Sequence, residues 1–278
     1  MKLDDVLKVT NLNVDKAAEI AITGLSLDSR AIEDGFAFVA IQGSGRHGME
    51  YVDQAISRGA VVVLYDHWDG PLPSGIPSIA VPKLRERLGV IAHAFFGHPA
   101  ERMQVIGVTG TNGKTTTVHL IGQLANGLGL KVGRMGTLGI FVDSDQVVDG
   151  ERTTPDAVSV AEHFATFRDR GVGLCAMEVS SHALDQYRVA GVPFEVGVFT
   201  NLTRDHLDYH GTMAAYGAAK RRLFTDYPLR AAVIDIDDAF GARLAIDLPD
   251  LDQWILGSNA AGKTTVLRII MAHHGSLL

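Results

Sequence analysis

The residues Val105-Ile-Gly-Val-Thr-Gly-Thr-Asn-Gly-Lys-Thr-Thr-Thr117 give the strongest structural signal in this 278-residue chain. Their first four positions form an apolar run that is typical of a short buried strand, and a glycine-rich turn, Gly110–Gly113, follows. Lys114 and Thr115 then open a segment whose apolar residues have helical spacing. A strand, a glycine loop and a helix N-terminus in this order wrap a polyphosphate with backbone N–H groups.

The side chains that open this helix suit a nucleotide with its metal ion. Lys114 would neutralise phosphate charge, and the hydroxyl of Thr115 would ligate Mg²⁺. The strict pattern G-x-x-x-x-G-K-[ST] is not met, because position 108 is valine. A glycine turn that merely caps an ordinary helix is the alternative. The Lys-Thr pair directly after the glycine, with a strand before it, favours the nucleotide loop.

Composition limits the partners of the chain. Hydrophobic residues make up 46% and charged residues 21%, the formal net charge is −7, and no basic block indicates nucleic acid or an anionic membrane as a partner. The first twenty residues carry charges throughout, and no apolar run approaches transmembrane length. Cys175 is the single cysteine and lies in an apolar run, which favours core packing. We therefore expect a cytoplasmic protein.

Apolar runs and breakers predict three parts: residues 1–98, 99–250 and 251–278. In the first part we expect two helices and three short strands: Tyr51–Ser57, Leu84–Phe96, Phe36–Ile41, Ala60–Leu64 and Ser78–Val81. Phe96-Gly-His-Pro99 then breaks the pattern. In the second part strands alternate with helical segments. The predicted strands are Val105–Val108, Leu174–Val179, Val196–Thr200 and Ala232–Ile236, and the predicted helices are Lys114–Leu128, Ala157–Arg170 and Met213–Phe224. The alternation predicts an α/β fold, in which helices cover both faces of a mostly parallel sheet.

Polar residues follow the predicted strands, where ligands bind in such sheets. Glu178 closes a strand and could reach a metal ion held by Thr115, although a strand-end acid more often faces solvent. Two aspartates and two histidines crowd into six residues after the next strand: Asp205, His206, Asp208 and His210. They could serve a divalent ion or phosphoryl transfer, and a hydrogen-bonded polar loop is an equal alternative.

Two further candidates are weaker when each is taken alone. Lys220 lies on the following helix, where a solvated basic face is the simpler interpretation. Ser180 and His182 could suggest a nucleophile with its base, but no Gly-x-Ser-x-Gly elbow surrounds the serine.

Taken together, these motifs closely resemble the central domain of the MurE-type Mur ligases, the UDP-N-acetylmuramoyl-tripeptide synthetases. The resemblance spans residues 20 to about 245 and rests on six motifs: Gly110–Thr117, Thr153-Thr154-Pro155, Ala176–His182, Gln186-x-Arg188, Thr200–Gly211 and Ala218-Ala-Lys220. Leu27-Asp-Ser-Arg30 and the glycine-rich segment Gly43–Gly48 are similar to the UDP-binding domain of the same family. The Leu27–Arg30 region argues against folate polyglutamate ligases, which share the phosphate loop.

The resemblance implies roles for individual residues. ATP phosphates would bind at Gly110, Thr111, Asn112, Gly113, Lys114, Thr115 and Thr116. Thr115 and Glu178 would ligate one Mg²⁺ and His206 a second, while Lys220 would be the carbamylated lysine of the family. Leu27, Ser29, Ser44, Gly45 and Arg46 would contact the UDP part of the substrate. Thr153, Thr154, Ser180, Gln186 and Arg188 would hold its peptide part. Arg152 stands where we would expect a small polar residue such as asparagine.

The implied reaction adds a third amino acid, diaminopimelate or lysine, to UDP-MurNAc-L-Ala-D-Glu through an acyl phosphate made with ATP. We expect a monomer, with neither nucleic acid nor a membrane as partner. A module that binds ATP and the UDP-muramyl-peptide without turnover is the alternative, because the chain ends at Leu278, before the C-terminal domain of the family could follow. A truncated fold with little or no product is therefore expected.

The last stretch departs from the family. Gly257–Thr264 is a strict phosphate-loop match that resembles the loop of ABC-type ATPases, and only fourteen residues follow it. A working phosphate loop needs a parallel sheet behind it. We therefore expect residues 251–278 to form an atypical tail, foreign, frame-shifted or fused, and not a second nucleotide site.

Overall fold

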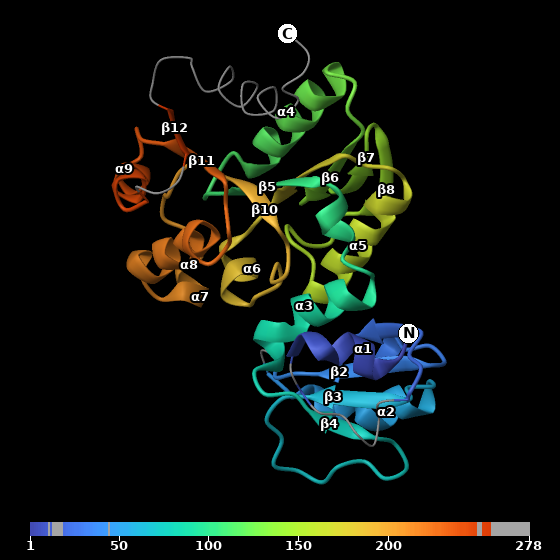
Figure 1. Ribbon diagram of the computed structural model, residues 1–278. Helices are drawn as coiled ribbons and strands as arrows, with labels where there is room; N and C mark the ends of the chain where they lie inside the picture. The colour runs from blue at the N-terminus through green and yellow to red at the C-terminus, as the bar shows by residue number, and fades with distance from the viewer. Residues whose placement is uncertain (11, 13–18, 44, 249–251, 257–278) are drawn as a thin grey trace. The chain divides into compact units, whose positions relative to one another are not determined.

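The computed structural model describes residues 1–10, 12, 19–43, 45–248 and 252–256 (Figure 1). The chain divides into two compact units, which are described separately. Unit 1 contains Met1–His98 together with Ala157–Glu162, and unit 2 contains Pro99–Asp156 and the residues from His163 onward. The phosphate-loop-like motif at Gly257–Thr264 lies outside the described residues.

Unit 1 is a parallel sheet with helices on both faces. Its four strands pair in sequence order: β1 (Gly24–Ser26), β2 (Phe36–Ala40), β3 (Val62–Tyr65) and β4 (Ser78–Ala80). Alternate side chains of β2 face opposite layers, as the pleat requires. Val39 joins a core with α1 (Leu3–Leu7) and α3 (Leu84–Phe95), while Phe38 joins a second core with α2 (Val52–Ser57).

Unit 2 is built on an eight-stranded sheet in the order β12-β11-β10-β5-β9-β6-β7-β8. The six strands that pair in parallel are β5 (Gln104–Thr109), β6 (Val132–Gly136), β9 (Leu174–Glu178), β10 (Phe194–Phe199), β11 (Ala231–Asp235) and β12 (Asp252–Leu256). The two antiparallel strands at one edge are β7 (Gly139–Val142) and β8 (Asp145–Asp149).

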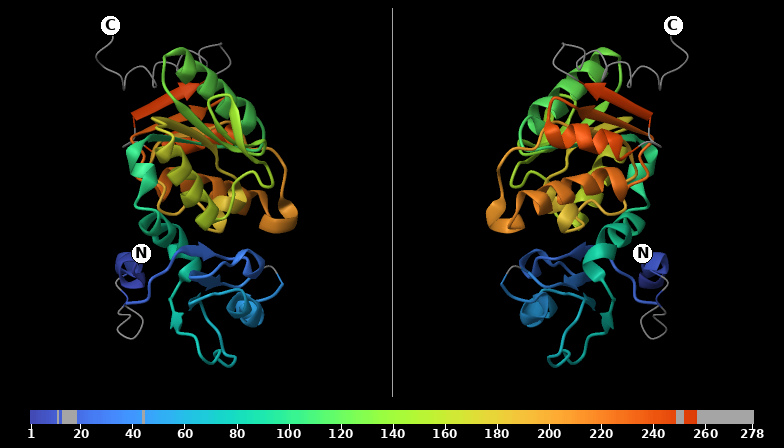
Figure 2. Two further views of the ribbon diagram at one scale, coloured as in Figure 1. Left: turned by 90° about the vertical axis from the view of Figure 1, so that its right-hand side faces the viewer. Right: turned by 90° about the vertical axis from the view of Figure 1, so that its left-hand side faces the viewer.

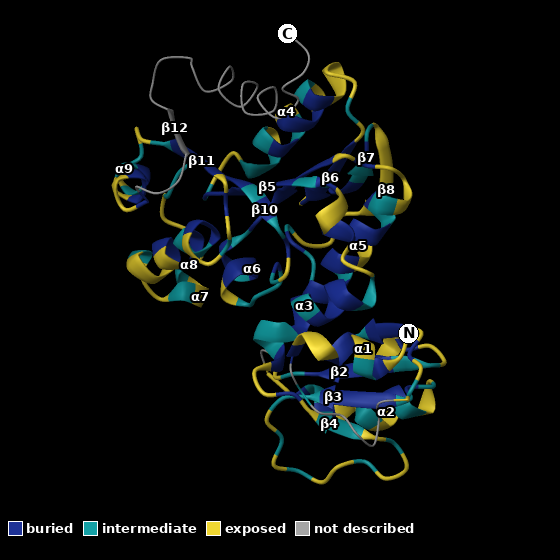
Figure 3. Cartoon of the chain, in the orientation of Figure 1, coloured by how far each residue is buried: buried dark blue, intermediate teal, exposed yellow. Residues whose placement is uncertain are grey.

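Helices cover both faces of this sheet (Figure 2). They are α4 (Lys114–Gly127), α5 (Ala157–Asp169), α6 (Ser181–Asp185), α7 (Leu207–His210), α8 (Met213–Thr225) and α9 (Ala239–Ile246). Ile106 and Val108 of β5 pack with apolar residues of α4. Gly107 between them faces Leu223 of α8, so α4 and α8 lie on opposite faces. The central strands are buried on both sides (Figure 3).

The structure confirms the predicted α/β class and the mostly parallel sheet. The predicted strands and helices agree with the observed ones to within two residues at each end, and Cys175 is fully buried in β9, where burial raises the pKa of its thiol. The strands β1, β6, β7, β8 and β12 and the helices α1, α6, α7 and α9 were not predicted. None of the helices in the described ranges has the length and hydropathy that spanning a membrane requires.

Candidate active site

Two residues of the glycine loop between β5 and α4 have backbone conformations that favour glycine. Gly110 has φ +147° and Gly113 has φ +86°, both in the region that L side chains avoid. A Cβ atom at Gly110 would also collide with Thr200 Oγ1. The turn can therefore fold closely against the segment after β10 and bring its N–H groups to the start of α4.

Residues that follow β10 hold this loop in shape. Thr111 N donates to Asn201 O at 2.8 Å, and Asn112 N donates to the Asn201 side-chain oxygen at 3.0 Å. The Thr200 hydroxyl donates to Asn112 O at 2.6 Å. These contacts pre-organise the loop, so binding a phosphate there requires little new ordering.

Lys114 folds back over the loop that it follows. Its Nζ donates to Gly110 O at 2.9 Å and to Thr111 O at 2.8 Å. Burial lowers the pKa of Lys114, and the nearby carboxylates of Glu178 and Asp205 counteract part of that effect. The cation therefore already lies inside the loop in which a polyphosphate would bind.

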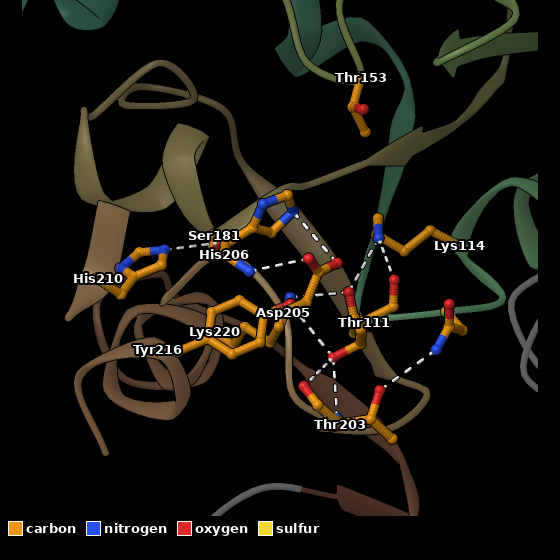
Figure 4. A network of polar contacts seen from close by, with 12 residues as sticks. Thr111, Lys114, Thr153, Ser181, Thr203, Asp205, His206, His210, Tyr216 and Lys220 are labelled. Atoms are coloured by element: carbon orange, nitrogen blue, oxygen red, sulfur yellow. Dashed lines mark hydrogen bonds and ion pairs between the residues drawn. The ribbon is translucent and has the colours of Figure 1, made fainter. Parts of the chain in front are cut away.

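Lys220 of α8 reaches the same loop from the other side (Figure 4). Its Nζ donates to Gly110 O at 2.7 Å and lies 4.5 Å from the centre of the Tyr216 ring. The residue is only 1% exposed. Burial, followed by repulsion from Lys114, lowers the pKa of Lys220 to about 7. Lys220 therefore does not lie on a solvated helix face, and it is readily deprotonated near neutral pH.

Glu178, at the end of β9, is buried beside the start of α4. Its Oε1 atom accepts hydrogen bonds from the Thr115 hydroxyl and from Thr137 N, both at 2.9 Å. Magnesium takes octahedral oxygen ligands at about 2.0–2.1 Å, so neighbouring ligands lie about 2.8–3.0 Å apart. The oxygens of Thr115 and Glu178 have the spacing of two adjacent magnesium ligands. They fit the ion that the sequence predicts, provided that phosphate and water oxygens complete its coordination.

The aspartate and histidine side chains that follow β10 contact several different partners. His206 Nε2 lies 3.5 Å from an Asp205 carboxylate oxygen, and His210 Nε2 lies 3.0 Å from Ser181 Oγ. The His182 ring packs against the rings of His206 and Tyr209. Across the described residues, no group of three or more His, Cys, Asp or Glu side chains could hold a metal ion. A second ion at His206 would therefore depend on ligands from ATP or substrate.

Four of the five predicted peptide-binding residues of unit 2 form one hydrogen-bonded group, while Thr153 contacts Thr137. The Thr154 hydroxyl donates to Glu178 O at 2.9 Å, and Ser180 N donates to Thr154 Oγ1 at 3.1 Å. Arg188 donates to Thr154 O at 2.9 Å and to the Gln186 side-chain oxygen at 2.7 Å. Ser180 caps α6 by accepting from Ala183 N. The guanidinium and the hydroxyls are thus fixed to the backbone at the end of β9, the strand that carries Glu178.

The predicted UDP contacts belong to unit 1. Ser29 is buried and its hydroxyl donates to the Gln54 side chain at 2.6 Å, while Leu27 is half-buried. Gly45 and Arg46 are exposed, and Ser44 lies outside the described residues.

Sequence reasoning missed residues whose role is visible only in three dimensions. Thr137 contacts Glu178 from the turn between β6 and β7. The Tyr209 hydroxyl donates to Asp185 at 2.7 Å and accepts from Gln186 at 3.0 Å. No motif or spacing marks these contacts, because they join residues that are far apart in the chain.

Comparison with family models gives two adjacent matches. Residues 21–96 match the model described as Mur ligase family, catalytic domain, and residues 108–253 match the model described as Mur ligase middle domain.

Similar curated proteins carry one functional name. The UDP-N-acetylmuramoyl-L-alanyl-D-glutamate–2,6-diaminopimelate ligase of Xanthomonas campestris pv. campestris (strain 8004) is 49% identical over 271 residues, which are 95% of this chain and 54% of that protein. The ligase of the same name from Alkalilimnicola ehrlichii is 47% identical over 244 residues, 84% of this chain and 49% of that protein. The chain thus spans about half the length of the curated relatives it matches.

A solved structure of a ligase with this name superposes with a TM-score of 0.77 at 30% identity, over 92% of this chain and 52% of the other. The MurF ligase of Thermotoga maritima in complex with ADP has a TM-score of 0.59 at 20% identity, over 87% and 52% of the two chains. At that identity the second match shows a common fold and nothing more.

Proposed function

We propose a function from the premise that this chain belongs to the Mur ligase family. The chain carries the nucleotide-binding and substrate-binding parts of an ATP-dependent amide ligase of cell-wall precursor synthesis. One observation carries the proposal: Thr115 and Glu178 lie at magnesium-ligand spacing beside the loop that contains Lys114. The backbone carbonyl of Glu178 is joined through Thr154 to Arg188. Phosphate-binding and carboxylate-binding groups therefore meet at one end of the sheet.

The proposed reaction has two steps. The terminal carboxylate of the acceptor attacks the γ-phosphoryl group of ATP, which forms an acyl phosphate and releases ADP. An amine then attacks the acyl carbon, which forms the amide and releases phosphate and a proton. Lys114 and the loop N–H groups would hold the phosphates, Arg188 would orient the acceptor, and Mg²⁺ would neutralise the charge that develops.

We assign substrates from the names of the relatives. These proteins are named for UDP-N-acetylmuramoyl-L-alanyl-D-glutamate and 2,6-diaminopimelate, so we propose the same acceptor and amine for the protein to which this chain belongs. Leu27, Ser29, Gly45 and Arg46 would contact the UDP part, while Thr153, Thr154, Ser180, Gln186 and Arg188 would contact the peptide. A cytoplasmic monomer is the corresponding proposal for location and assembly, because both ATP and the UDP substrate are cytoplasmic metabolites.

Lys220 supports a modification that belongs to the same proposal. A neutral lysine amine adds to CO₂, forming an N–C bond and losing a proton, and the carbamate that results is an anion. The lowered pKa of Lys220, about 7, makes the neutral amine available at physiological pH. A carbamate there would lie near Lys114 and could orient a magnesium ion.

The proposal is tested by nucleotide binding and by product formation. Mg²⁺-ATP should bind the chain, and Lys114→Ala should weaken it more than about tenfold, or about 1.4 kcal/mol. Calorimetry measures the affinity, and mass spectrometry detects the tripeptide product from ATP, the UDP-dipeptide and diaminopimelate.

The outcomes separate the two candidate functions. Product formation supports the ligase, whereas binding of both ligands without product supports a binding module. Equal ATP affinity in Lys114→Ala and the parent would remove the nucleotide site from the proposal.

A further inference from the structure

The hairpin turn that joins β6 to β7 touches the proposed metal site and the proposed substrate site at once. Thr137, in this turn, donates its backbone N–H to Glu178 Oε1 at 2.9 Å. Its Oγ1 atom lies 3.2 Å from Glu178 Oε2 and 3.1 Å from Thr153 Oγ1. A single residue that no motif identified therefore contacts both carboxylate oxygens and a neighbouring hydroxyl.

The directions of these hydrogen bonds follow from counting hydrogens. A hydroxyl carries one hydrogen, and an ionised carboxylate can only accept. Thr137 must therefore donate to Glu178 if both contacts of its Oγ1 atom are hydrogen bonds, and Thr153 must then donate to Thr137. The result is a chain that runs from the Thr153 hydroxyl through the Thr137 hydroxyl to the Glu178 carboxylate.

The local backbone is adapted to this contact. Gly136 precedes Thr137, and a Cβ atom at Gly136 would collide with Glu178 Oε1. Gly139 closes the turn with φ +116°. The turn can therefore lie directly against the carboxylate, and Glu178 remains only 1% exposed.

We infer that Thr137 is a positioning residue that orients Glu178 for the magnesium ion and links that carboxylate to Thr153. The inference rests on the proposed function, which supplies the ion and the substrate role of Thr153. If the Thr115 hydroxyl ligated the ion, Glu178 would lose one of its donors. The backbone N–H and the hydroxyl of Thr137 would still hold the carboxylate in place.

The decisive experiment compares nucleotide binding with and without Mg²⁺ in the 278-residue chain. Calorimetry with a non-hydrolysable ATP analogue is carried out in MgCl₂ and in EDTA for the parent, Thr137→Val and Thr137→Ser. Valine keeps the shape and the backbone N–H but removes the hydroxyl, and serine restores the hydroxyl. Thr137→Val should weaken binding about tenfold in MgCl₂ and leave it unchanged in EDTA, whereas Thr137→Ser should behave like the parent.

The link to Thr153 is tested by a double-mutant cycle in MgCl₂. Thr153→Val should weaken binding of the analogue about threefold in the parent and have no effect in the Thr137→Val background, because its hydrogen bond reaches Glu178 only through Thr137. Additive effects would overturn the link.

Other results overturn the positioning role. Parent-like binding of Thr137→Val in MgCl₂ would do so, and so would an equal loss in MgCl₂ and EDTA, which would indicate a general structural defect. Failure of the proposed function is a separate result, because it would appear as absent UDP-dipeptide binding while the magnesium dependence of these variants persists.

Discussion

Two lysine side chains donate to the same carbonyl oxygen, that of Gly110, in the glycine loop. Two cations so close repel each other, and burial adds to the cost of charging either one. The pKa values of both are lowered, and that of Lys220, the more buried of the two, falls to about 7. The loop therefore holds two amines that repel each other, and a bound anion would offset their charge.

The charge state of Lys220 should control both stability and reaction with CO₂. A lysine whose folded pKa is lowered destabilises the fold below about pH 7, and this penalty fades as the pH rises from about 7 towards the ordinary value of 10.5. Lys220→Met should therefore stabilise the chain most at pH 6 and least near pH 10, as measured by urea unfolding across this range. Carbamate formation from ¹³C-bicarbonate, followed by NMR, should rise with pH through 7 in the parent only.

A matched control for this prediction is Lys131, an exposed lysine directly before β6 in unit 2. Lys131→Met should leave the pH dependence of the unfolding free energy as it is in the parent. A parent-like pH profile in Lys220→Met would show that Lys220 is not buried as a neutral amine.

At the level of single residues, the sequence predicted the side chains that belong to motifs and missed those that act across the fold. Lys114, Thr115 and Glu178 were predicted, because each follows a strand or opens a helix in a defined order. Burial of Lys220 could not be predicted from a helix that also carries two arginines beside it. Thr137 has no local signal at all, since its contacts come from residues about forty and sixteen positions away.

Among the elements, β6 shows why a strand can escape prediction. It contains Gly133, Arg134 and Gly136, which have low or ambiguous strand propensity. The two glycines are needed by the fold, because Gly133 lies against the Phe167 ring of α5 and Gly136 lies against Glu178. The residues that allow close packing are therefore the same ones that weaken the sequence pattern.

The short helix α9 supports the site through its N-cap residue, Asp238. Asp238 Oδ1 accepts from Phe240 N at 2.9 Å and from Gly241 N at 3.0 Å, and Oδ2 accepts from Leu202 N at 2.9 Å. One carboxylate thus caps the helix and anchors the segment that holds the glycine loop. Asp238→Ala should lower the free energy of unfolding by about 1–2 kcal/mol, because a helix cap is worth about that much.

Asp238→Asn separates the two roles in the same urea titration. Asparagine keeps an oxygen for the cap but replaces the second acceptor with an N–H donor, so we expect an intermediate loss. If both variants unfold at the parent's urea concentration, Asp238 does not stabilise either element.

Across the whole molecule, the division into units does not follow the chain order. The break predicted at residue 98 ends the first stretch of unit 1, but Ala157–Glu162 also belongs to that unit. Ala157, Val158 and Ala161 are buried in the same apolar cluster as Leu25 and Val39. The spacing of apolar residues could not predict that residues 157–162 join the core of unit 1. Such spacing indicates that one face of a helix is buried, but not which core buries it.

A fragment of residues 1–98 should consequently be less stable than the same residues in the intact chain. Losing the buried valine and two alanines removes roughly 2 kcal/mol of apolar burial. Backbone amides of β2 should then exchange with deuterium more than about tenfold faster in the fragment, as measured by mass spectrometry after peptic digestion. Equal protection in fragment and intact chain would show that residues 157–162 contribute nothing to this core.

The lone thiol of the chain has a practical meaning beyond packing. Cys175 lies in the middle of β9, three residues before Glu178, and burial raises the pKa of its thiol and shields it from solvent. Alkylating reagents react with an exposed thiolate, so the folded sheet protects the only cysteine in the sequence from alkylation. The rate at which Cys175 is alkylated therefore reports how often the central sheet opens. A ligand that stabilises the Glu178 end of β9 should lower this rate, and no label has to be engineered to measure it.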